Sequence, residues 1–184
     1  MRYYAVFIFS LVILSCKTEK EETKQNRFEI KKHHVGIITD STQIKDLKVL
    51  FCNDSIVNYK EDDSFIGGIN TYDIFENNGN LILSIVPYEA LDSTSTIDFI
   101  LIKDSRYKTE KGISVLSTYQ DIKNTYSISE FRNTLNSIEL IINEIDATFI
   151  IDKKELLTTF DYGVEIDSTQ LPNSSKFSSF IINF

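Results

Sequence analysis

The chain has 184 residues, of which 42% are hydrophobic and 25% are charged, with 19 basic residues, 27 acidic residues and two cysteines. This composition is that of a foldable globular chain and excludes collagen-like, low-complexity and disulfide-rich architectures. The acidic balance argues against nucleic-acid binding, which depends on Lys and Arg side chains that neutralise phosphates.

The N-terminus predicts a signal peptide over residues 1–15. Arg2 precedes an uncharged run from Tyr3 to Leu14, which as a helix would measure about 18 Å, too short for the roughly 30 Å core of a bilayer. A short basic segment, an apolar segment and a small residue before the cleavage point are typical of secretion. Ile13-Leu14-Ser15-Cys16 resembles the lipobox of bacterial lipoproteins, which implies that Cys16 becomes the acylated first residue of the mature chain. The alternative is a plain secretory signal with an incidental cysteine.

Residues 16–27 are predicted to form a solvated tether, because residues 17–27 include no apolar side chain that could offset their ordering entropy. Acyl chains on Cys16 would hold the protein on a membrane, since each buried CH₂ contributes about 0.8 kcal/mol. Lys17 does not resemble the Asp that retains many lipoproteins at the inner membrane. The acidic cluster within residues 19–22 resembles an export signal of surface lipoproteins. We therefore expect a lipid-anchored protein of the bacterial cell envelope, on the outer membrane rather than the inner.

The remaining chain is predicted to hold two α+β repeats, residues 28–103 and 104–184. Residues 36–48 and 112–123 share Gly-Ile, Ser-Thr and Asp-(Leu/Ile)-Lys in the same order. Similarity at a fixed offset indicates an internal duplication, and chance similarity of common residue pairs is the alternative. This folded part carries 14 basic and 24 acidic residues, a net charge of −10.

Each shared phrase predicts a short amphipathic helix with one apolar stripe. The stripes are Ile44, Leu47, Leu50 and Phe51 in the first repeat and Tyr119, Ile122 and Tyr126 in the second. Thr118 to Asp121 resembles a capping box, in which the hydroxyl and the carboxylate satisfy free amides of the first helical turn. Both helices are therefore expected to pack on an apolar surface.

Short runs rich in Ile, Phe, Tyr, Val and Leu follow each helix and predict antiparallel strands. The expected strands are 55–60, 69–76, 81–86 and 97–103 in the first repeat, and 128–131, 138–143, 147–151 and 177–184 in the second. Asn78-Gly79 is a hairpin signal, and residues 152–158 are predicted as a short helix. The predicted class is α+β, in which a short helix precedes an antiparallel meander, twice.

Residues 107–113, with 117–118 and 121–123, resemble a segment common in small uncharacterised bacterial lipoproteins, and so does Thr169-Gln170-Leu171-Pro172 before the final apolar strand. That family supplies no activity to transfer to this chain.

A more distant, architectural resemblance is to the small lipoprotein subunit of the outer-membrane barrel-assembly machinery and to the tandem-repeat β-lactamase inhibitor protein. Both place a helical segment that begins Gly-x-Thr-x-x-x-Val before an antiparallel sheet. Thr118 and Ile122 match the Thr and Val positions, whereas Leu116 stands at the Gly position. The resemblance implies a protein-binding sheet surface without catalysis.

Candidate chemical groups are few. His33-His34 are the only histidines, and adjacent side chains on a strand point to opposite faces, so we expect a solvated pair rather than a metal site. Cys52 follows the first apolar stripe and is predicted to be a buried structural residue. Its neighbours Asn53 and Asp54 do not favour a reactive thiolate.

Two further features could bind small ligands. Asp54 with the acidic run 61–63 could supply oxygen ligands to calcium, although no Asp-x-Asp-x-Asp-Gly loop accompanies them. Gly67-Gly68 predicts a flexible bend and is too short for a phosphate-binding loop.

These patterns favour a non-enzymatic envelope lipoprotein that needs no cofactor. Its predicted partners are a membrane, through the anchor at Cys16, and another envelope protein. One alternative is a surface lipoprotein that captures a small ligand or cation between its repeats, and another is an enzyme of unrecognised type.

Overall fold

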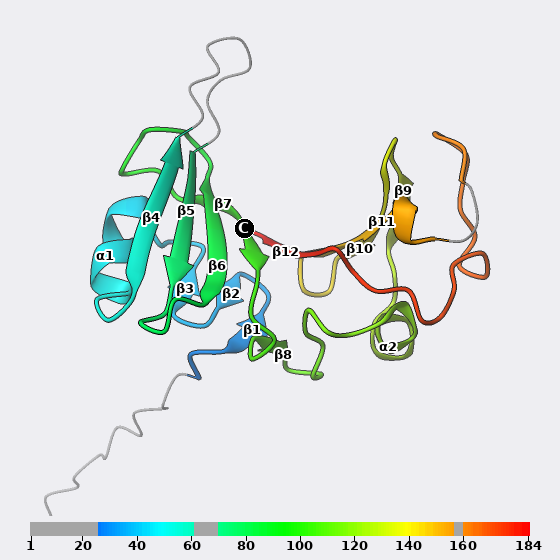
Figure 1. Cartoon of the computed structure of the whole chain (residues 1–184), viewed down its shortest axis with the longest axis horizontal. Coiled ribbons are helices and arrows are strands. Elements are labelled where there is room, and N and C mark those ends of the chain that lie inside the picture. The colour runs from blue at the N-terminus through cyan, green and yellow to red at the C-terminus, as the bar shows by residue number, and fades with distance from the viewer. Residues whose placement is uncertain (1–25, 61–69, 157–159) are drawn as a thin grey trace, which may run out of the picture.

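The computed structural model describes residues 26–60, 70–156 and 160–184 (Figure 1). The predicted signal peptide, Cys16 and all but the end of the tether lie outside the described residues. The same holds for residues 61–63 of the proposed calcium cluster and for Gly67-Gly68. No helix in the described ranges is long and apolar enough to cross a membrane.

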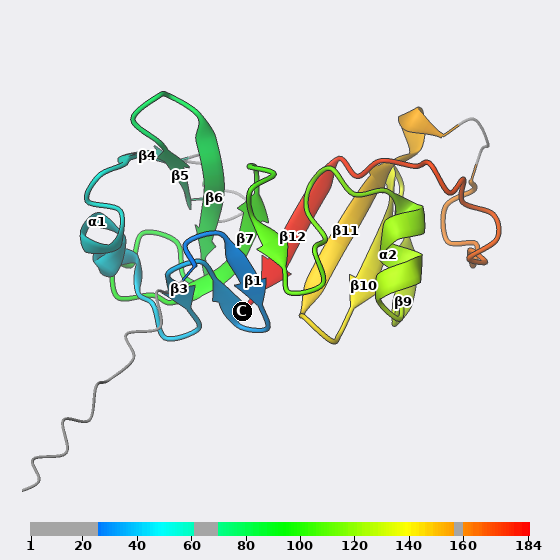
Figure 2. The same ribbon diagram turned by 90° about the horizontal axis from the view of Figure 1, so that it is seen from below.

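One antiparallel sheet of eight strands dominates the fold. Its spatial order is β4-β5-β6-β7-β12-β11-β10-β9, and every neighbouring pair is antiparallel. The strands are β4 (Ser55–Lys60), β5 (Asn70–Phe75), β6 (Leu81–Pro87), β7 (Ile97–Ile102), β9 (Glu130–Asn133), β10 (Ser137–Ile142), β11 (Ala147–Asp152) and β12 (Ser179–Asn183). Figure 2 shows them as one curved row from β4 to β9.

Alternation along the strands produces the core face of the sheet. In β10 every second residue is buried, and β11 alternates in the opposite phase. The buried set includes Ile138, Leu140, Ile142, Ala147, Phe149 and Ile151. Because side chains of an extended strand point to the two faces in turn, this pattern leaves one face for the core and the other partly exposed.

Two short helical segments pack apolar stripes against this sheet. The first joins the 3-10 turn η1 (Ile44–Asp46) to α1 (Leu47–Leu50), and the second is α2 (Tyr119–Thr125). The predicted stripe residues are buried except Leu50, which is half-buried. The segment η1–α1 lies beside β4, and α2 lies by β9 and β10 at the other end of the sheet (Figures 1 and 2).

A second sheet of four very short strands was not predicted. Its order is β3-β2-β1-β8, with β1 (Glu29–Lys31), β2 (His34–Val35), β3 (Ile38–Thr39) and β8 (Lys108–Thr109). Strand β1 pairs in parallel with β8, so the start of the folded part contacts the segment that joins the two halves. Strands of two or three residues are too short to show a period of two in the sequence.

The predicted α+β class is confirmed as a mostly antiparallel β structure with few short helices. All eight predicted strands of the large sheet are present. The strand predicted over 128–131 runs instead from Glu130 to Asn133, and the helix predicted over 152–158 is reduced, in its described part, to the 3-10 turn η2 (Lys153–Glu155).

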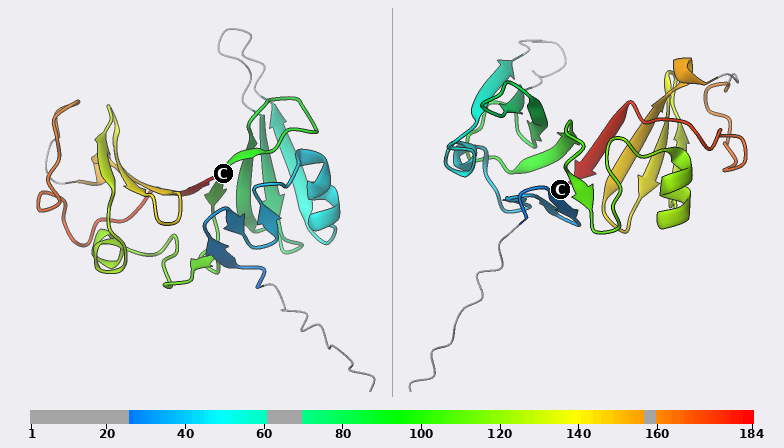
Figure 3. Two further views of the ribbon diagram at one scale, coloured as in Figure 1. Left: turned by 180° about the vertical axis from the view of Figure 1, so that it is seen from behind. Right: turned by 60° about the horizontal axis from the view of Figure 1, so that its bottom comes forward.

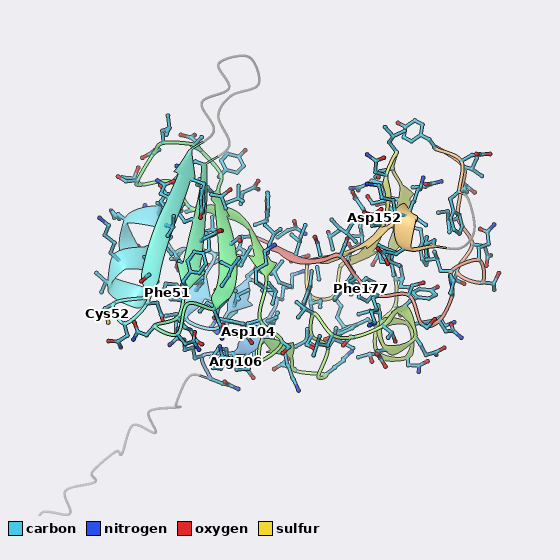
Figure 4. All side chains as sticks on the ribbon, in the orientation of Figure 1. Phe51, Cys52, Asp104, Arg106, Asp152 and Phe177 are labelled. Carbon is cyan, nitrogen blue, oxygen red and sulfur yellow. The ribbon has the colours of Figure 1, made fainter. Side chains whose placement is uncertain are left out.

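The prediction of a buried Cys52 is wrong. Phe51 occupies the last buried position of the first stripe and is 2% exposed, whereas Cys52 is exposed and forms no disulfide. Figure 4 shows Cys52 on the outside of the molecule, next to Phe51. The reason is that α1 ends after one turn, so the residue after Phe51 enters a turn instead of continuing the apolar face.

The histidine pair divides between two environments. His33 is exposed with a positive φ of 54°, and its Nε2 lies 3.3 Å from Asp146 Oδ2. His34 is half-buried in β2 rather than fully solvated.

Candidate functional site

A cleft of about 520 Å³ lies between the first helical segment and strands β4 and β5 at one edge of the large sheet. Side chains from η1–α1, β4, β5 and the β6–β7 connection line it: Ile44, Lys45, Leu47, Lys48, Ile56, Asn58, Tyr72 and Ser93. We call it the α1 cleft.

Capping and backbone hydrogen bonds position the helical side of the α1 cleft. The Gln43 amide donates to Asp46 Oδ2 at 3.1 Å, which closes one arm of a capping box. The next two amides, of Ile44 and Lys45, donate to the carbonyls of Ser95 and Ser93 at 3.0 and 2.8 Å. The first turn is thereby joined to the β6–β7 connection.

The same helical segment contributes both apolar and cationic groups to the lining of the α1 cleft. Ile44 and Leu47 are 6% and 1% exposed and supply apolar lining. Lys45 and Lys48, three residues apart, share one exposed helical face. Neither lysine forms an ion pair with a carboxylate in the part of the chain that the structure describes.

The sheet side of the α1 cleft combines apolar and polar groups. Asn58 of β4 stands opposite Tyr72 of β5 in the register, and the side-chain Nδ2 of Asn70 donates to Tyr72 Oη at 3.1 Å. Ile56 lies two residues before Asn58 and therefore on the same face. Strand β4 is an edge strand of the large sheet.

The second half contains a similar space between α2 and β9, the second corner, and the chain itself fills this space. Thr118 and Asp121 form a capping box, as predicted, and the Tyr119 and Gln120 amides donate to the carbonyls of Ser175 and Asn173 at 2.9 and 3.0 Å. The Tyr119 ring meets Phe131 of β9 edge-on, with centroids 6.4 Å apart. Burial raises the pKa of the Tyr119 hydroxyl.

A segment of the chain itself, residues 160–171, covers this second corner. The side-chain Nδ2 of Asn133 donates to the carbonyls of Asp161 and Val164 at 2.7 and 2.8 Å. Tyr119 Oη donates to the Ser168 carbonyl at 2.7 Å. In Figure 1 this segment, coloured orange, lies beyond β9, whereas no described segment takes that place beyond β4 and α1.

Among the described residues, the predicted candidates His33, His34, Cys52 and Asp54 do not form a metal-binding group. Asp54 pairs with Arg27, and the acidic run 61–63 lies outside the described residues. No group of three His, Cys, Asp or Glu side chains arranged to hold a metal ion occurs within residues 26–60, 70–156 and 160–184. The predicted lipidation site Cys16 also lies outside these ranges.

Residue patterns alone did not single out the α1 cleft. Lys45 and Lys48 lie on the polar face of a predicted helix, and Tyr72 lies in a predicted strand. The signal that could have found them is the pairing of a cationic helical face with an edge strand. Which helix lies beside which strand depends on the tertiary structure, and the spacing of residues in the sequence does not specify it.

The sequence matches no protein family and no curated protein. In structure the chain is similar to the crystal structure of the uncharacterized protein yfeY from Escherichia coli, with a TM-score of 0.60 and 15% sequence identity. The similarity covers 85% of this chain and 99% of that one, so it extends over both halves. At this identity the similarity shows a shared fold with an uncharacterized bacterial protein and carries no activity.

Proposed function

We propose that this chain is a bacterial envelope lipoprotein anchored through Cys16, and that its folded part is a non-catalytic protein-binding or structural module. The lipobox-like Ile13-Leu14-Ser15-Cys16 supports the anchor. The observation that carries the binding role is the α1 cleft, which offers apolar surface and two ammonium groups that form no ion pair within the described residues. Such a lining can bind a segment of a partner protein.

We further propose that residues 28–103 and 104–184 are two copies of one unit. In both halves a capped first turn donates two successive amides to the connection before the last strand of that half. The strand orders β4-β5-β6-β7 and β9-β10-β11-β12 run inward from opposite edges, and the last strands meet in the middle of the sheet. A common ancestral unit accounts for both features.

A second candidate function is the capture of a small ligand between the two halves. One observation favours it: a cavity of about 140 Å³ at the junction of β7 and β12, lined by residues that include Lys103, Val115 and Phe177. A thermal-shift screen with calcium, sugars and peptides separates the candidates, because a ligand of the folded state raises the unfolding temperature. A shift with calcium or a sugar alone favours the second function.

Replacing Cys16 with Ser tests the anchor. We expect the native protein to incorporate labelled palmitate and to fractionate with outer membranes, and the Cys16→Ser protein to do neither, because the acyl chains supply the membrane affinity. Cys52→Ser is the matched control and should remain on the membrane. Unchanged membrane retention and labelling of the Cys16→Ser protein would refute the proposal.

A further inference from the structure

We propose that the α1 cleft binds an extended acidic segment of a partner protein that also carries apolar side chains. This inference rests on the proposed function as a protein-binding module and names the chemistry of the partner. Its basis is the second half, where residues 160–171 occupy the matching place.

The second half shows how such a corner is covered. The covering segment offers main-chain carbonyls, and side-chain donors on the edge strand and the helix bind them. Asn133 of β9 binds the carbonyls of Asp161 and Val164, and Tyr119 of α2 binds that of Ser168. The contact therefore spans the space between an edge strand and a helix, which is also the space of the α1 cleft.

The covering segment has a clear chemical character. Residues 160–171 contain three acidic residues and no basic residue. Phe160 and Ile166 are half-buried and pack against the core, and Leu171 is 3% exposed. The segment is thus both acidic and apolar.

The first half has no equivalent cover among its described residues. The connection from β6 to β7 spans only residues 88–96, whereas the connection from β11 to β12 spans residues 153–178. The carbonyls of Ser93 and Ser95 in this short connection accept hydrogen bonds from the amides at the start of the first helical segment. Ile44, Leu47, Ile56 and Tyr72 line the cavity that this short connection leaves. In both views of Figure 3, α1 lies at the outer edge of the first half.

Charge selects an acidic occupant. Lys123 of α2 stands at the helical position that Lys48 takes in the first segment, five residues after the N-cap. Lys123 contacts other residues of the second half: its Nζ lies 5.2 Å from the Tyr119 ring and donates to Asn173 Oδ1 at 2.9 Å. Within the described chain neither Lys48 nor Lys45 has such a contact, so both ammonium groups face the α1 cleft without a partner from these residues. In a folded part of net charge −10, these two groups attract an acidic segment locally.

The test uses a fluorescent peptide with the sequence of residues 160–171, the segment that covers the second corner. A matched peptide carries Lys in place of Asp161, Glu165 and Asp167. Fluorescence anisotropy with the mature protein should give a Kd below about 1 mM for the acidic peptide. The lysine peptide should bind at least about tenfold more weakly, because like charges oppose each other across the contact.

Protein variants locate the binding site. Lys45→Glu with Lys48→Glu should weaken binding of the acidic peptide about tenfold or more. The control pair, Lys108→Glu with Lys154→Glu, changes two exposed lysines elsewhere by the same charge and should leave the affinity within about twofold. Circular dichroism of the two double variants checks that each remains folded. Absence of peptide binding, equal binding of the two peptides, or an unchanged affinity after reversal of Lys45 and Lys48 would overturn the proposal.

Two further arms separate this inference from its rivals. In the first, the Cys16→Ser protein is mixed with vesicles of anionic or of zwitterionic lipid. If the protein binds anionic vesicles through Lys45 and Lys48 but does not bind the peptide, the α1 cleft is a membrane contact and the inference is overturned. In cells, a photo-crosslinking residue is placed at Asn58 in the cleft or at the exposed Leu135 of the other half. A partner captured only from Leu135 leaves the proposed function standing and overturns the inference, and capture from neither position contradicts both.

Discussion

At the scale of single residues, one cluster joins the start of the folded part to the junction of the two halves. The Phe28 ring meets the buried Tyr107 ring edge-on at 5.0 Å, and the Arg106 guanidinium lies 4.4 Å from the Phe28 centroid. Hydrogen bonds from Arg106 hold the pKa values of Glu76 and Asp104 below their usual range. The charge of Arg106, which lies in the segment that joins the two halves, is therefore neutralised locally by Asp104 and Glu76 (Figure 4).

Because of Tyr107, we expect the stability of the protein to fall at alkaline pH. Burial raises the pKa of the Tyr107 hydroxyl to about 12, against an ordinary value of 10.0. Between these values the folded state binds more protons than the unfolded state, so the free energy of unfolding falls as pH rises, by up to about 1.4 kcal/mol per pH unit. The stability that the neutral Tyr107 hydroxyl contributes is complete below pH 10 and is lost as pH rises toward 12.

Urea unfolding at pH values from 9 to 12 checks this expectation. Tyr107→Phe lacks the ionisable group and should show a shallower decline than the native protein over that interval. A residual slope is expected, because burial also raises the pKa values of Tyr119 and Tyr126. Parallel declines in the two proteins would show that Tyr107 does not carry the effect.

At the scale of elements, capping explains how such short helices form. Helix α2 has seven residues, a length that is marginal on its own in water. Thr118 Oγ1 accepts from the Asp121 amide at 3.4 Å, and Asp121 Oδ2 accepts from the Thr118 amide at 2.8 Å. Hydrogen bonds from Thr118 lower the pKa of Asp121, and the bond from the backbone amide has a larger effect than the bond from the hydroxyl.

Loss of the cap should destabilise the whole protein. Thr118→Ala removes the N-cap hydroxyl, and we expect the free energy of unfolding at neutral pH to fall by about 1 kcal/mol. Because the pKa of Asp121 is lowered in the folded state, its contribution exists above the ordinary Asp value and is lost as pH falls through the lower folded value. Urea titrations therefore should show a smaller difference between the two proteins in strong acid. Thr96→Ala, at an exposed position, is the control, and an equal loss in that variant would contradict the capping role.

At the scale of the whole molecule, the two halves share one sheet. Strands β7 and β12 pair antiparallel, with Phe180 opposite Ile102 and Ile182 opposite Ile100. Phe180 is 1% exposed and stacks on Phe149 with centroids 4.3 Å apart. The core therefore continues across the boundary predicted between residues 103 and 104.

This continuity predicts cooperative unfolding of both halves. Phe180→Ala should lower the free energy of unfolding by about 3–5 kcal/mol, because it leaves a cavity in the shared core. Hydrogen exchange should show that amides in β5, β6, β10 and β11 lose protection together. Leu135→Ala, at a residue 71% exposed, should change little. Loss of protection confined to β10 and β11 would show that the halves unfold separately.

Local pattern alone determined much of this protein. Alternation predicted the eight long strands, the helical stripes predicted the buried faces of α1 and α2, and Thr118 with Asp121 predicted a cap. These signals succeed because periodicity and capping depend on residues within a few positions of one another.

Tertiary structure alone decided the pairing of β7 with β12, the small sheet that joins β1 to β8, the exposure of Cys52 and the open α1 cleft. Pairing depends on which strand edges meet, and those strands lie about 80 residues apart in the chain. Cys52 and the cleft depend on where a helix ends and on which segment covers it. Contacts between distant residues determine these features, and no period in the sequence records them.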